Sequence, residues 1–489
     1  MRQAESIDSI AEQFVFRRFG EVCDLLNGLA FTPEDWSATG LPIIRIQNLN
    51  GGQEFNFCQG AVPKEFVIRP GTLLFAWSGN RGTSFGPSVW QGPTGVLNQH
   101  IFKVTPKPGT DARWLHHALH IARERAEREA HGGSGLVHVR REELLSFEIP
   151  TPRPQDQRRI AAALDTVDEA IAKTEAVIAK LKQVRAGLLH DLLTRGLDLS
   201  ACDLPVGRHG AQAGEHGRLR DPIAHPEQFR DSPLGRIPKE WETKTLSALC
   251  KHIGSGVTPR GGQDVYTTEG VTFIRSQNVT FEGLLLSDIA FIPEEIHRGM
   301  LRSEVFAHDV LFNITGASIG RCCPMPDGLG RANVNQHVCV LRVPDATAED
   351  STYLASVLAS PIGQRQLETL NTFGNRQGLN YQQLGSFVLP WPDRSERKMI
   401  ADRIVAADAQ RHAAEREKAK LTLLKSGLMT DLLTGRVRVR EGVGGWMSCL
   451  GKLTGAAGVT DQSNRSDPTD RSNPTFTVAP VSAIGEEAP

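Results

Sequence analysis

The sequence predicts an α+β protein in which two tandem β-rich α/β domains are joined by two long antiparallel coiled-coil helices. A heptad pattern of apolar residues runs through residues 151–196, and a second copy of it runs through residues 386–436. A β-rich segment precedes each copy, so the chain is a tandem duplication with a period near half its length. The order is domain, helix, domain, helix. Two helices paired in that order must run antiparallel, which predicts pseudo-two-fold symmetry.

Length and composition bound the class of protein. The 489 residues suit roughly three domains, with 39% hydrophobic and 23% charged residues. No apolar run approaches the roughly 20 residues of a membrane span, and the N-terminus lacks the apolar core of a signal peptide. We therefore expect a cytoplasmic protein without a membrane partner. Eight scattered cysteines form no C-x-x-C pair, which favours reduced thiols and predicts no metal site. The net charge of −1 disfavours indiscriminate coating of nucleic acid but permits a sequence-specific reader.

The first half of the chain is predicted as one domain and one helix. Residues 14–150 alternate Val-, Ile- and Phe-rich runs with Gly, Pro and Asn turns, and one helix interrupts them near residues 111–130. A central helix follows at residues 151–196, because prolines at 150, 152 and 154 prevent an earlier start. Its apolar positions alternate four and three apart, as in a coiled-coil seam: Ile160, Leu164, Val167, Ile171, Ile178, Leu181 and Leu188. One helix of about 40 residues would span on the order of 60 Å, and its single apolar stripe needs a partner.

The predicted partner is a C-terminal helix at residues 391–436, which matches the first helix after a shift of 240 positions. The shift predicts seam positions at Ile400, Ile404, Leu421 and Leu428. Arg411, Lys418 and Lys425 stand where the first helix has Ile171, Ile178 and Arg185, so the second seam is less apolar.

The other boundaries follow from composition and from the repeat. Residues 197–236 are rich in Gly, His and Pro and indicate a linker. Residues 237–390 repeat the β-rich pattern, again with one helix, near residues 351–370. Residues 441–489 are rich in Gly, Ser, Thr and Pro and predict a disordered tail. The globular copies match between residues 41–50 and 271–280, and between Asn98-Gln99-His100 and Asn335-Gln336-His337.

No catalytic residue is predicted. The segment 444–453 resembles a phosphate-binding loop, but Trp446 stands at the first glycine position and Leu453 at the Ser/Thr position. Asn473-Pro474-Thr475-Phe476 lacks the second proline of an adenine-methyltransferase motif, and no glycine-rich cofactor loop precedes it. Asp393, Glu396 and Lys398 are too closely spaced for a nuclease centre.

Polar residues in glycine-flanked loops are the candidate DNA contacts, because Arg suits guanine edges and phosphates, and Asn or Gln suits adenine. The first domain offers Arg45, Gln47, Asn48, Asn80, Arg81, Thr83 and Ser84. The second domain offers Arg260, Arg275, Gln277, Asn278, Thr315, Ser318, Arg321, Asn333 and Arg376. The alternative is that such loops occur on any β-rich domain.

The duplication separates these candidates into two groups. If the domains read different targets, residues identical in both cannot carry the difference. The shared Asn-Gln-His triplets and the Gln47-Asn48 and Gln277-Asn278 pairs are therefore interpreted as turn scaffold, with phosphate contact as the alternative. Positions that differ are better candidates for base reading: Asn80 against Ala317, Arg81 against Ser318, and Ser84 against Arg321.

The sequence resembles the specificity subunits of type I restriction–modification systems over about residues 14–440. The motifs are SPLGRIPKEWETKTL at 232–246, DVLFNITGASIGRC at 309–322, GLNYQQLGSFVLPWP at 378–392, and the paired endings GLLHDLLTRG at 187–196 and GLMTDLLTGR at 427–436. The first domain departs from the pattern, because it lacks the Pro-x-x-Trp lead-in that the second has at Pro238 and Trp241.

The resemblance implies two target recognition domains, each reading half of a split double-stranded DNA site, and a helix pair that sets the gap. It implies no enzymatic activity or cofactor in this chain. S-adenosylmethionine would bind to two methyltransferase subunits, and ATP and Mg²⁺ to restriction/translocase subunits. The sequence leaves two alternatives open: a self-contained fused methyltransferase, and a coiled-coil assembly adaptor with degenerate DNA binding.

Overall fold

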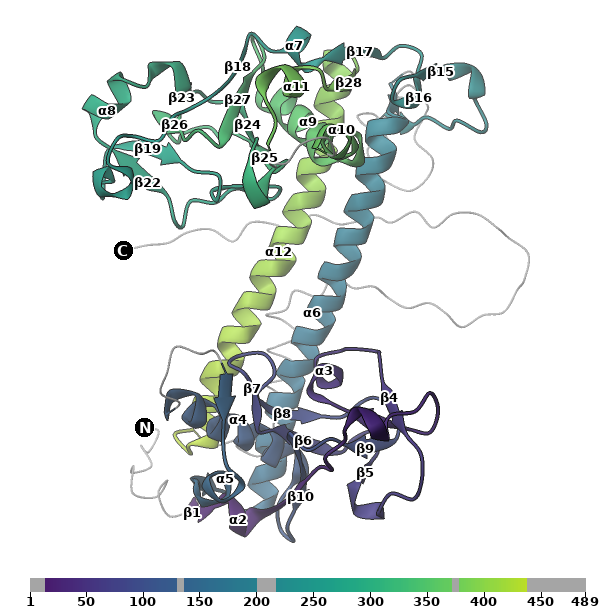
Figure 1. Cartoon of the computed structure of the whole chain (residues 1–489), viewed down its shortest axis with the longest axis vertical. Coiled ribbons are helices and arrows are strands. Elements are labelled where there is room, and N and C mark those ends of the chain that lie inside the picture. The colour runs from purple at the N-terminus through teal and green to yellow at the C-terminus, as the bar shows by residue number, and fades with distance from the viewer. Residues whose placement is uncertain (1–13, 130–135, 200–216, 372–377, 438–489) are drawn as a thin grey trace, which may run out of the picture. The chain divides into compact units, whose positions relative to one another are not determined.

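The computed structural model describes residues 14–129, 136–199, 217–371 and 378–437 (Figure 1). The chain divides into two compact units, one within residues 1–174 and 417–489 and the other at residues 175–416. Each unit holds one β-rich domain and one half of each long helix, so the helices are parts of the domain cores rather than separate segments. The predicted tail at 441–489 and Arg376 lie outside the described residues.

The first β-rich domain is built on two four-stranded sheets. One has the order β2 (Cys23–Asn27), β10 (Ile101–Pro106), β6 (Leu73–Ala76), β8 (Gly86–Val89). The other has the order β4 (Asn56–Cys58), β3 (Leu41–Ile44), β9 (Gly95–Leu97), β5 (Val67–Ile68), with β3 and β9 parallel. Two-stranded pairs join β1 (Val15–Arg18) to β12 (Glu148–Thr151), and β7 (Ser78–Asn80) to β11 (Leu136–His138). The helices are α2 (Phe19–Val22), α3 (Ile46–Leu49), α4 (Ala112–Glu129) and α5 (Arg141–Ser146).

The second β-rich domain repeats this strand order. One sheet runs β18 (His252–Ser255), β27 (Val338–Arg342), β24 (Val310–Asn313), β25 (Cys322–Pro324). The other runs β22 (Ala290–Ile292), β19 (Val271–Ile274), β26 (Ala332–Val334), β23 (Glu304–Val305), and its β19–β26 pair is again parallel. Further pairs are β17 (Glu242–Thr245) with β28 (Val388–Trp391), and β20 (Val279–Thr280) with β21 (Gly283–Leu284). The helices are α7 (Leu246–Leu249), α8 (Glu294–Arg298), α9 (Ala348–Ala359), α10 (Pro361–Asn371) and α11 (Tyr381–Gly385).

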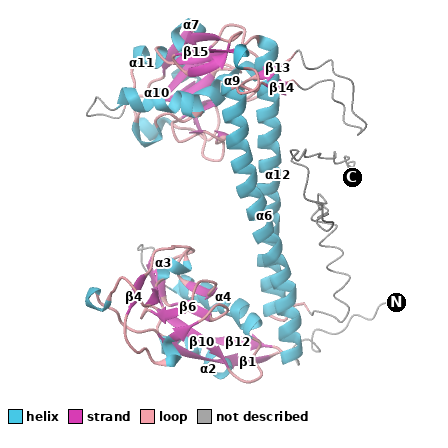
Figure 2. Cartoon of the chain, turned by 90° about the vertical axis from the view of Figure 1, so that its right-hand side faces the viewer, coloured by secondary structure: helices cyan, strands magenta, loops and turns pink. Residues whose placement is uncertain are grey.

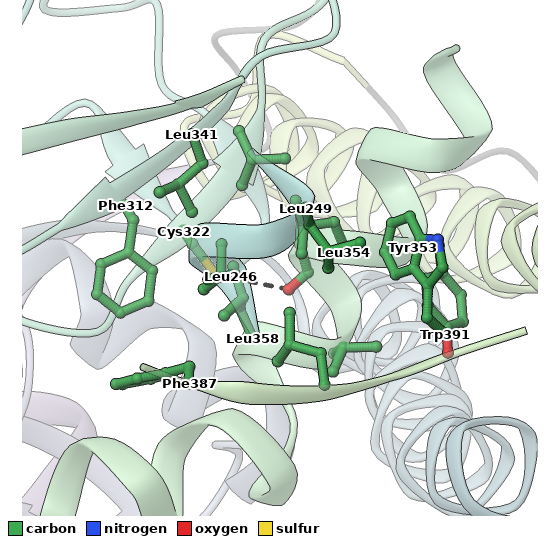
Figure 3. Close-up of a cluster of buried hydrophobic side chains, with 14 of the residues drawn as sticks. Leu246, Leu249, Phe312, Cys322, Leu341, Tyr353, Leu354, Leu358, Phe387 and Trp391 are labelled. Carbon is green, nitrogen blue, oxygen red and sulfur yellow. Dashed lines mark hydrogen bonds between the residues drawn. The ribbon is translucent and has the colours of Figure 1, made fainter. Parts of the chain in front are cut away.

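One predicted helix of the second domain is two helices. Instead of a single element near residues 351–370, α9 ends at Ala359 and α10 begins at Pro361. Ser360 between them is extended, with φ −75° and ψ 170°. A residue before proline avoids the helical region, and proline has no N–H to continue the helix. The break lets α9 pack on the sheet through Tyr353, Leu354 and Leu358, which are fully buried beside Phe312 and Leu341 (Figure 3).

The long helices are α6 (Pro154–Thr194) and α12 (Arg394–Leu433), close to their predicted extents (Figure 2). Gly196 and Gly435, just beyond their ends, have φ of 64° and 76°, a left-handed stop that suits glycine. Seven seam positions are buried: Ile160, Leu164, Val167, Ile178, Ile400, Ile404 and Leu421. Four are half-buried: Ile171, Leu181, Leu188 and Leu428.

Within each unit the start of one long helix packs beside the end of the other. In the first unit Ile160 and Leu164 share a core with Leu432 and Leu433. In the second unit Leu192 and Leu193 share a core with Ile400 and Ile404. In both units the helices therefore run in opposite directions.

The described parts of the predicted linker carry secondary structure. β13 (Leu197–Asp198) pairs with β14 (Arg218–Leu219), and β15 (Phe229–Ser232) pairs with β16 (Gly235–Pro238). Leu197 and Phe229 are buried and attach these short strands to the core. The many Gly, His and Pro residues around them predicted a linker instead. Among the helices of the described ranges, none is long and apolar enough to cross a membrane.

Candidate nucleic-acid interface

Asn48 and Asn278, which occupy matching positions in the two domains, are buried and stabilise their loops by internal hydrogen bonds. Asn48 is 6% exposed, its Oδ1 accepts from the Arg45 backbone N–H at 3.0 Å, and its Nδ2 donates to the Gly52 and Glu54 carbonyls at 3.0 and 2.8 Å. Asn278 is 0% exposed and repeats the pattern: it accepts from Arg275 N at 3.0 Å and donates to two carbonyls at 3.0 Å each. Both amide protons of each side chain are used, so neither can donate to a base. This geometry favours the scaffold interpretation of the shared pairs.

The arginines of the same loops are also engaged within their domains. The Arg45 guanidinium lies 5.4 Å from the Trp36 ring centroid and donates to Asn56 Oδ1. The Arg275 guanidinium lies 5.7 Å from the Tyr266 ring centroid and pairs with Asp288 at 3.2 Å. Cation–π contacts and hydrogen bonds hold both groups half-buried. The adjacent Gln47 and Gln277 are exposed, and each donates within its own domain, Gln47 Nε2 to the Glu54 carbonyl at 3.4 Å and Gln277 Nε2 to Asp288 Oδ2.

Asn333 is a core residue, which corrects its prediction as a DNA contact. It is 0% exposed on β26, and its Nδ2 donates to the Met300 carbonyl at 2.9 Å and Ser303 Oγ at 3.3 Å. Its Oδ1 contacts His297 Nδ1. All three residues of β26 are buried, so this strand is covered on both faces, which a short polar run in the sequence does not reveal.

The exposed candidates that differ between the domains lie on corresponding connections. In the first domain the connection from β6 to β8 exposes Asn80, Arg81 and Thr83, while Ser84 is half-buried. The turn is anchored on α4, because Arg81 Nη2 donates to the Glu127 carbonyl at 2.6 Å and Gly82 N donates to Glu127 Oε1 at 3.1 Å.

The second domain presents different side chains at the same place. The connection from β24 to β25 contains the 3-10 turn Gly316–Ser318. It exposes Arg321 and leaves Thr315 and Ser318 half-buried. Arg260, on a separate loop of this domain, is also exposed. The two domains thus share the same strand arrangement and differ in the polar side chains that the corresponding connections expose.

The shared Asn-Gln-His triplets form turns packed against glycine. A Cβ added at Gly28 would lie 2.1 Å from the Asn98 carbonyl oxygen, and one at Gly256 would lie 1.6 Å from the Val334 oxygen. Only glycine permits this approach. In the second domain Gln336 contacts His337 Nε2 at 3.0 Å, and His337 Nδ1 contacts Thr315 Oγ1. The triplet therefore braces the loop that carries Thr315.

Sequence reasoning missed a histidine cluster where α4 packs on the long helices. His117 is 0% exposed, and its Nε2 lies 2.8 Å from Asp165 Oδ1 on α6. Burial lowers the pKa of His116 to about 4 and of His120 to about 2, and it also lowers the pKa of His117. Lys425 of α12, paired with Asp168 of α6, opposes protonation of all three rings. The rings therefore act as neutral packing groups.

These lowered pKa values predict acid lability of the first unit. A histidine with a folded pKa below its unfolded value near 6.5 leaves the fold most stable above pH 6.5. Stability is lost as the pH falls from 6.5 toward 4 for His116 and toward 2 for His120, because the unfolded chain binds more protons. Replacing His116 and His120 with Gln should shift the acid-unfolding midpoint of the first unit to lower pH, measured by hydrogen exchange of α4. A midpoint unchanged from the parent protein would show that these rings do not control it.

Glu396, weighed in the sequence as part of a nuclease motif, is the centre of a buried structural network. Its side chain is 2% exposed, and Oε1 accepts from Arg220 Nη1 and from the Leu197 backbone N–H, both at 2.6 Å. Oε2 accepts from Trp241 Nε1 at 3.0 Å. The network ties the start of α12 to Trp241 of the Pro-x-x-Trp lead-in and to the strand after α6. No group of three or more His, Cys, Asp or Glu suited to a metal occurs in the described part of the chain.

Fold and surface together define a class: in each unit a β-rich domain with its own set of exposed polar loop residues packs on parts of both long helices. Residues 11–183 match the family model of the type I restriction modification DNA specificity domain. The chain is 24% identical over 421 residues to the EcoBI specificity subunit of Escherichia coli, covering 84% of this chain and 82% of that one.

A second relative is the MjaVIII specificity subunit of Methanocaldococcus jannaschii, 22% identical over 383 residues, which covers 77% and 82% of the two chains. A type I restriction–modification S subunit from M. genitalium matches the fold with a TM-score of 0.51 at 16% identity, covering 88% of this chain and 98% of that one. The chain is therefore similar to the specificity subunits of type I restriction–modification systems, through the family model over residues 11–183 and through relatives along most of its length.

Proposed function

We propose that this chain is the DNA-specificity subunit of a type I restriction–modification complex and that each β-rich domain reads one half of a bipartite target. The observation that carries the proposal is the pair of corresponding loops. Asn80 and Arg81 are exposed in one domain, and Arg321 is exposed on the same connection in the other. Side chains of this kind read base edges, and a common frame with different side chains suits two different half-sites.

We further propose that α6 and α12 form one antiparallel coiled coil that sets the gap between half-sites. Two ion pairs support this register: Asp168 with Lys425 in the first unit, and Arg185 with Asp408 in the second. Arg185 lies seventeen residues after Asp168 on α6, and Asp408 lies seventeen residues before Lys425 on α12. The two pairs therefore fit one antiparallel register. The ion pairs also account for the polar residues Arg185 and Lys425 at seam positions, because each has a carboxylate partner on the facing helix.

The partners follow from this assignment. Two methyltransferase subunits would bind S-adenosylmethionine and modify the target, and restriction/translocase subunits would use ATP and Mg²⁺. This chain supplies recognition and assembly, and no reaction step is assigned to its residues. An assembly adaptor with degenerate DNA binding is the competing function.

Mapping methylated adenines tests the function directly. A genome carrying this subunit and its methyltransferase partner should acquire methylation at one split sequence, and the same genome without this chain should lack it. Methylation that ignores this chain, or a reconstituted complex that retards no genomic fragment, would favour the adaptor.

Lengthening the helix pair should lengthen the gap. We would insert one heptad between Thr174 and Glu175 and another between Lys418 and Ala419, which face each other in the proposed register. Seven residues add about 10 Å, or about three base pairs at 3.4 Å each, and a whole heptad keeps the seam aligned. Methylation mapping should return both half-sites unaltered with the longer gap. An unchanged gap would overturn the spacer role, and a three-residue insertion, which rotates the seam, is the control expected to impair assembly.

A further inference from the structure

A buried arginine on α12 joins the helices to the second recognition domain. The Arg411 side chain is 5% exposed, and its Nη1 donates to Glu415 Oε1 at 3.0 Å. Its Nη2 donates to Glu282 of the domain and lies 3.5 Å from Asp408 Oδ1. Asp408 also accepts two hydrogen bonds from the Arg185 guanidinium of α6. One connected charge network therefore links α6, α12 and the recognition domain, all within the second unit.

Glu282 is held in place by the hairpin that carries it. The residue lies between β20 and β21, where Glu282 N donates to Thr280 Oγ1 at 3.1 Å and Thr280 Oγ1 donates to the Gly283 carbonyl at 2.7 Å. Val279 is fully buried in the same core cluster as Leu311, and Leu284 packs against that cluster. The hairpin is thus attached to the domain core, so a contact that fixes the position of Glu282 also fixes the position of the domain.

The first half of the molecule cannot make this contact. The position matching Arg411 is Ile171, and the position matching Glu282 after the shift of 230 is Gly52. Arg411 is buried but Glu282 is 61% exposed, so the pair gains little net stability, because solvent screens the carboxylate and the guanidinium must be desolvated. The arginine therefore contributes orientation rather than stability, because its contact with Glu282 selects one orientation of the hairpin on the helix.

We propose that Arg411 is a positioning residue that, through Glu282, holds the second recognition domain at one angle on the helix pair and so makes the complex strict about gap length. The proposal rests on the proposed function, because it concerns how accurately the two half-sites are spaced. Without the contact only the shared apolar core, which is not directional, sets the angle of the domain on the helices, and sites with slightly wrong gaps become acceptable.

The test uses the full chain in complex with its methyltransferase subunits. Duplexes would carry the mapped half-sites at the native gap, one base pair longer and one base pair shorter. Arg411→Ile copies the matching residue of α6 and keeps the seam apolar, and Glu282→Gln removes the charge from a side chain that is 61% exposed. Each variant should raise the methylation rate at altered gaps, relative to the native gap, by on the order of tenfold, and the double variant should add nothing further.

Glu415→Gln is the matched control, because it removes a partner of Arg411 that lies on the same helix and leaves Glu282 in contact. It should stay as strict as the parent protein. Should Arg411→Ile fail to fold, the exposed Glu282→Gln still decides the matter. If both variants keep the parent's preference for the native gap, Arg411 does not position the domain through Glu282. If the parent complex methylates none of these duplexes, the proposed function itself is wrong.

Discussion

Replacing Glu396 with Ala is expected to destabilise the second unit by about 3–5 kcal/mol, the usual cost of leaving one partner of a buried ion pair alone. Arg220 would lose its deepest partner while its side chain stays 7% exposed. The Leu197 N–H and the Trp241 indole N–H would lose their acceptors. Urea unfolding followed by hydrogen exchange of β17 and β28 measures the loss in the unit concerned.

Two variants make this measurement specific. Glu396→Gln keeps the shape and an acceptor oxygen, so it should cost less than the alanine variant. Lys398→Ala, two residues along the same helix, removes ion pairs to Glu349 and Asp402 from a side chain that is 58% exposed. That change should stay within about 0.5 kcal/mol. Equal losses in Glu396→Ala and Lys398→Ala would contradict the buried network.

Exchanging residues 14–150 for the corresponding domain of another family member is expected to change one half-site and leave the other intact. Methylation of the original target should fall on the order of a thousandfold, because a changed half-site reduces binding to the nonspecific level. The structure adds a condition, since Trp114 and Leu115 of α4 share a core with Ile160 and Leu164 of α6. The donor domain must therefore present an α4 that fits this helix.

The reciprocal exchange, at residues 237–390, is the control and should change only the other half-site. Methylation mapping reads both results. Simultaneous change of both half-sites in either exchange would contradict independent reading by two domains.

The loop residues separate into two groups by what the fold does with them. Arg81 and Arg321 belong to turns that present side chains to solvent, whereas Asn48 and Asn278 turn inward and brace the chain. The duplication predicts that the differing positions read bases and the shared ones do not, because shared residues cannot distinguish two targets. It could not identify Asn333 as internal, since only the pairing of β26 between β19 and β23 orients that side chain.

The sequence by itself predicted two similar β-rich segments, each followed by one long helix with an apolar stripe. These features are periodic and local, because a repeated apolar stripe specifies a helix and its buried face whatever lies elsewhere. Only the tertiary structure decided which polar residues pair. Glu396 meets Arg220, 176 positions away, and Arg411 meets Glu282, 129 positions away. A charged side chain gives no periodic signal of its partner, so such contacts emerge only when the fold brings distant segments together.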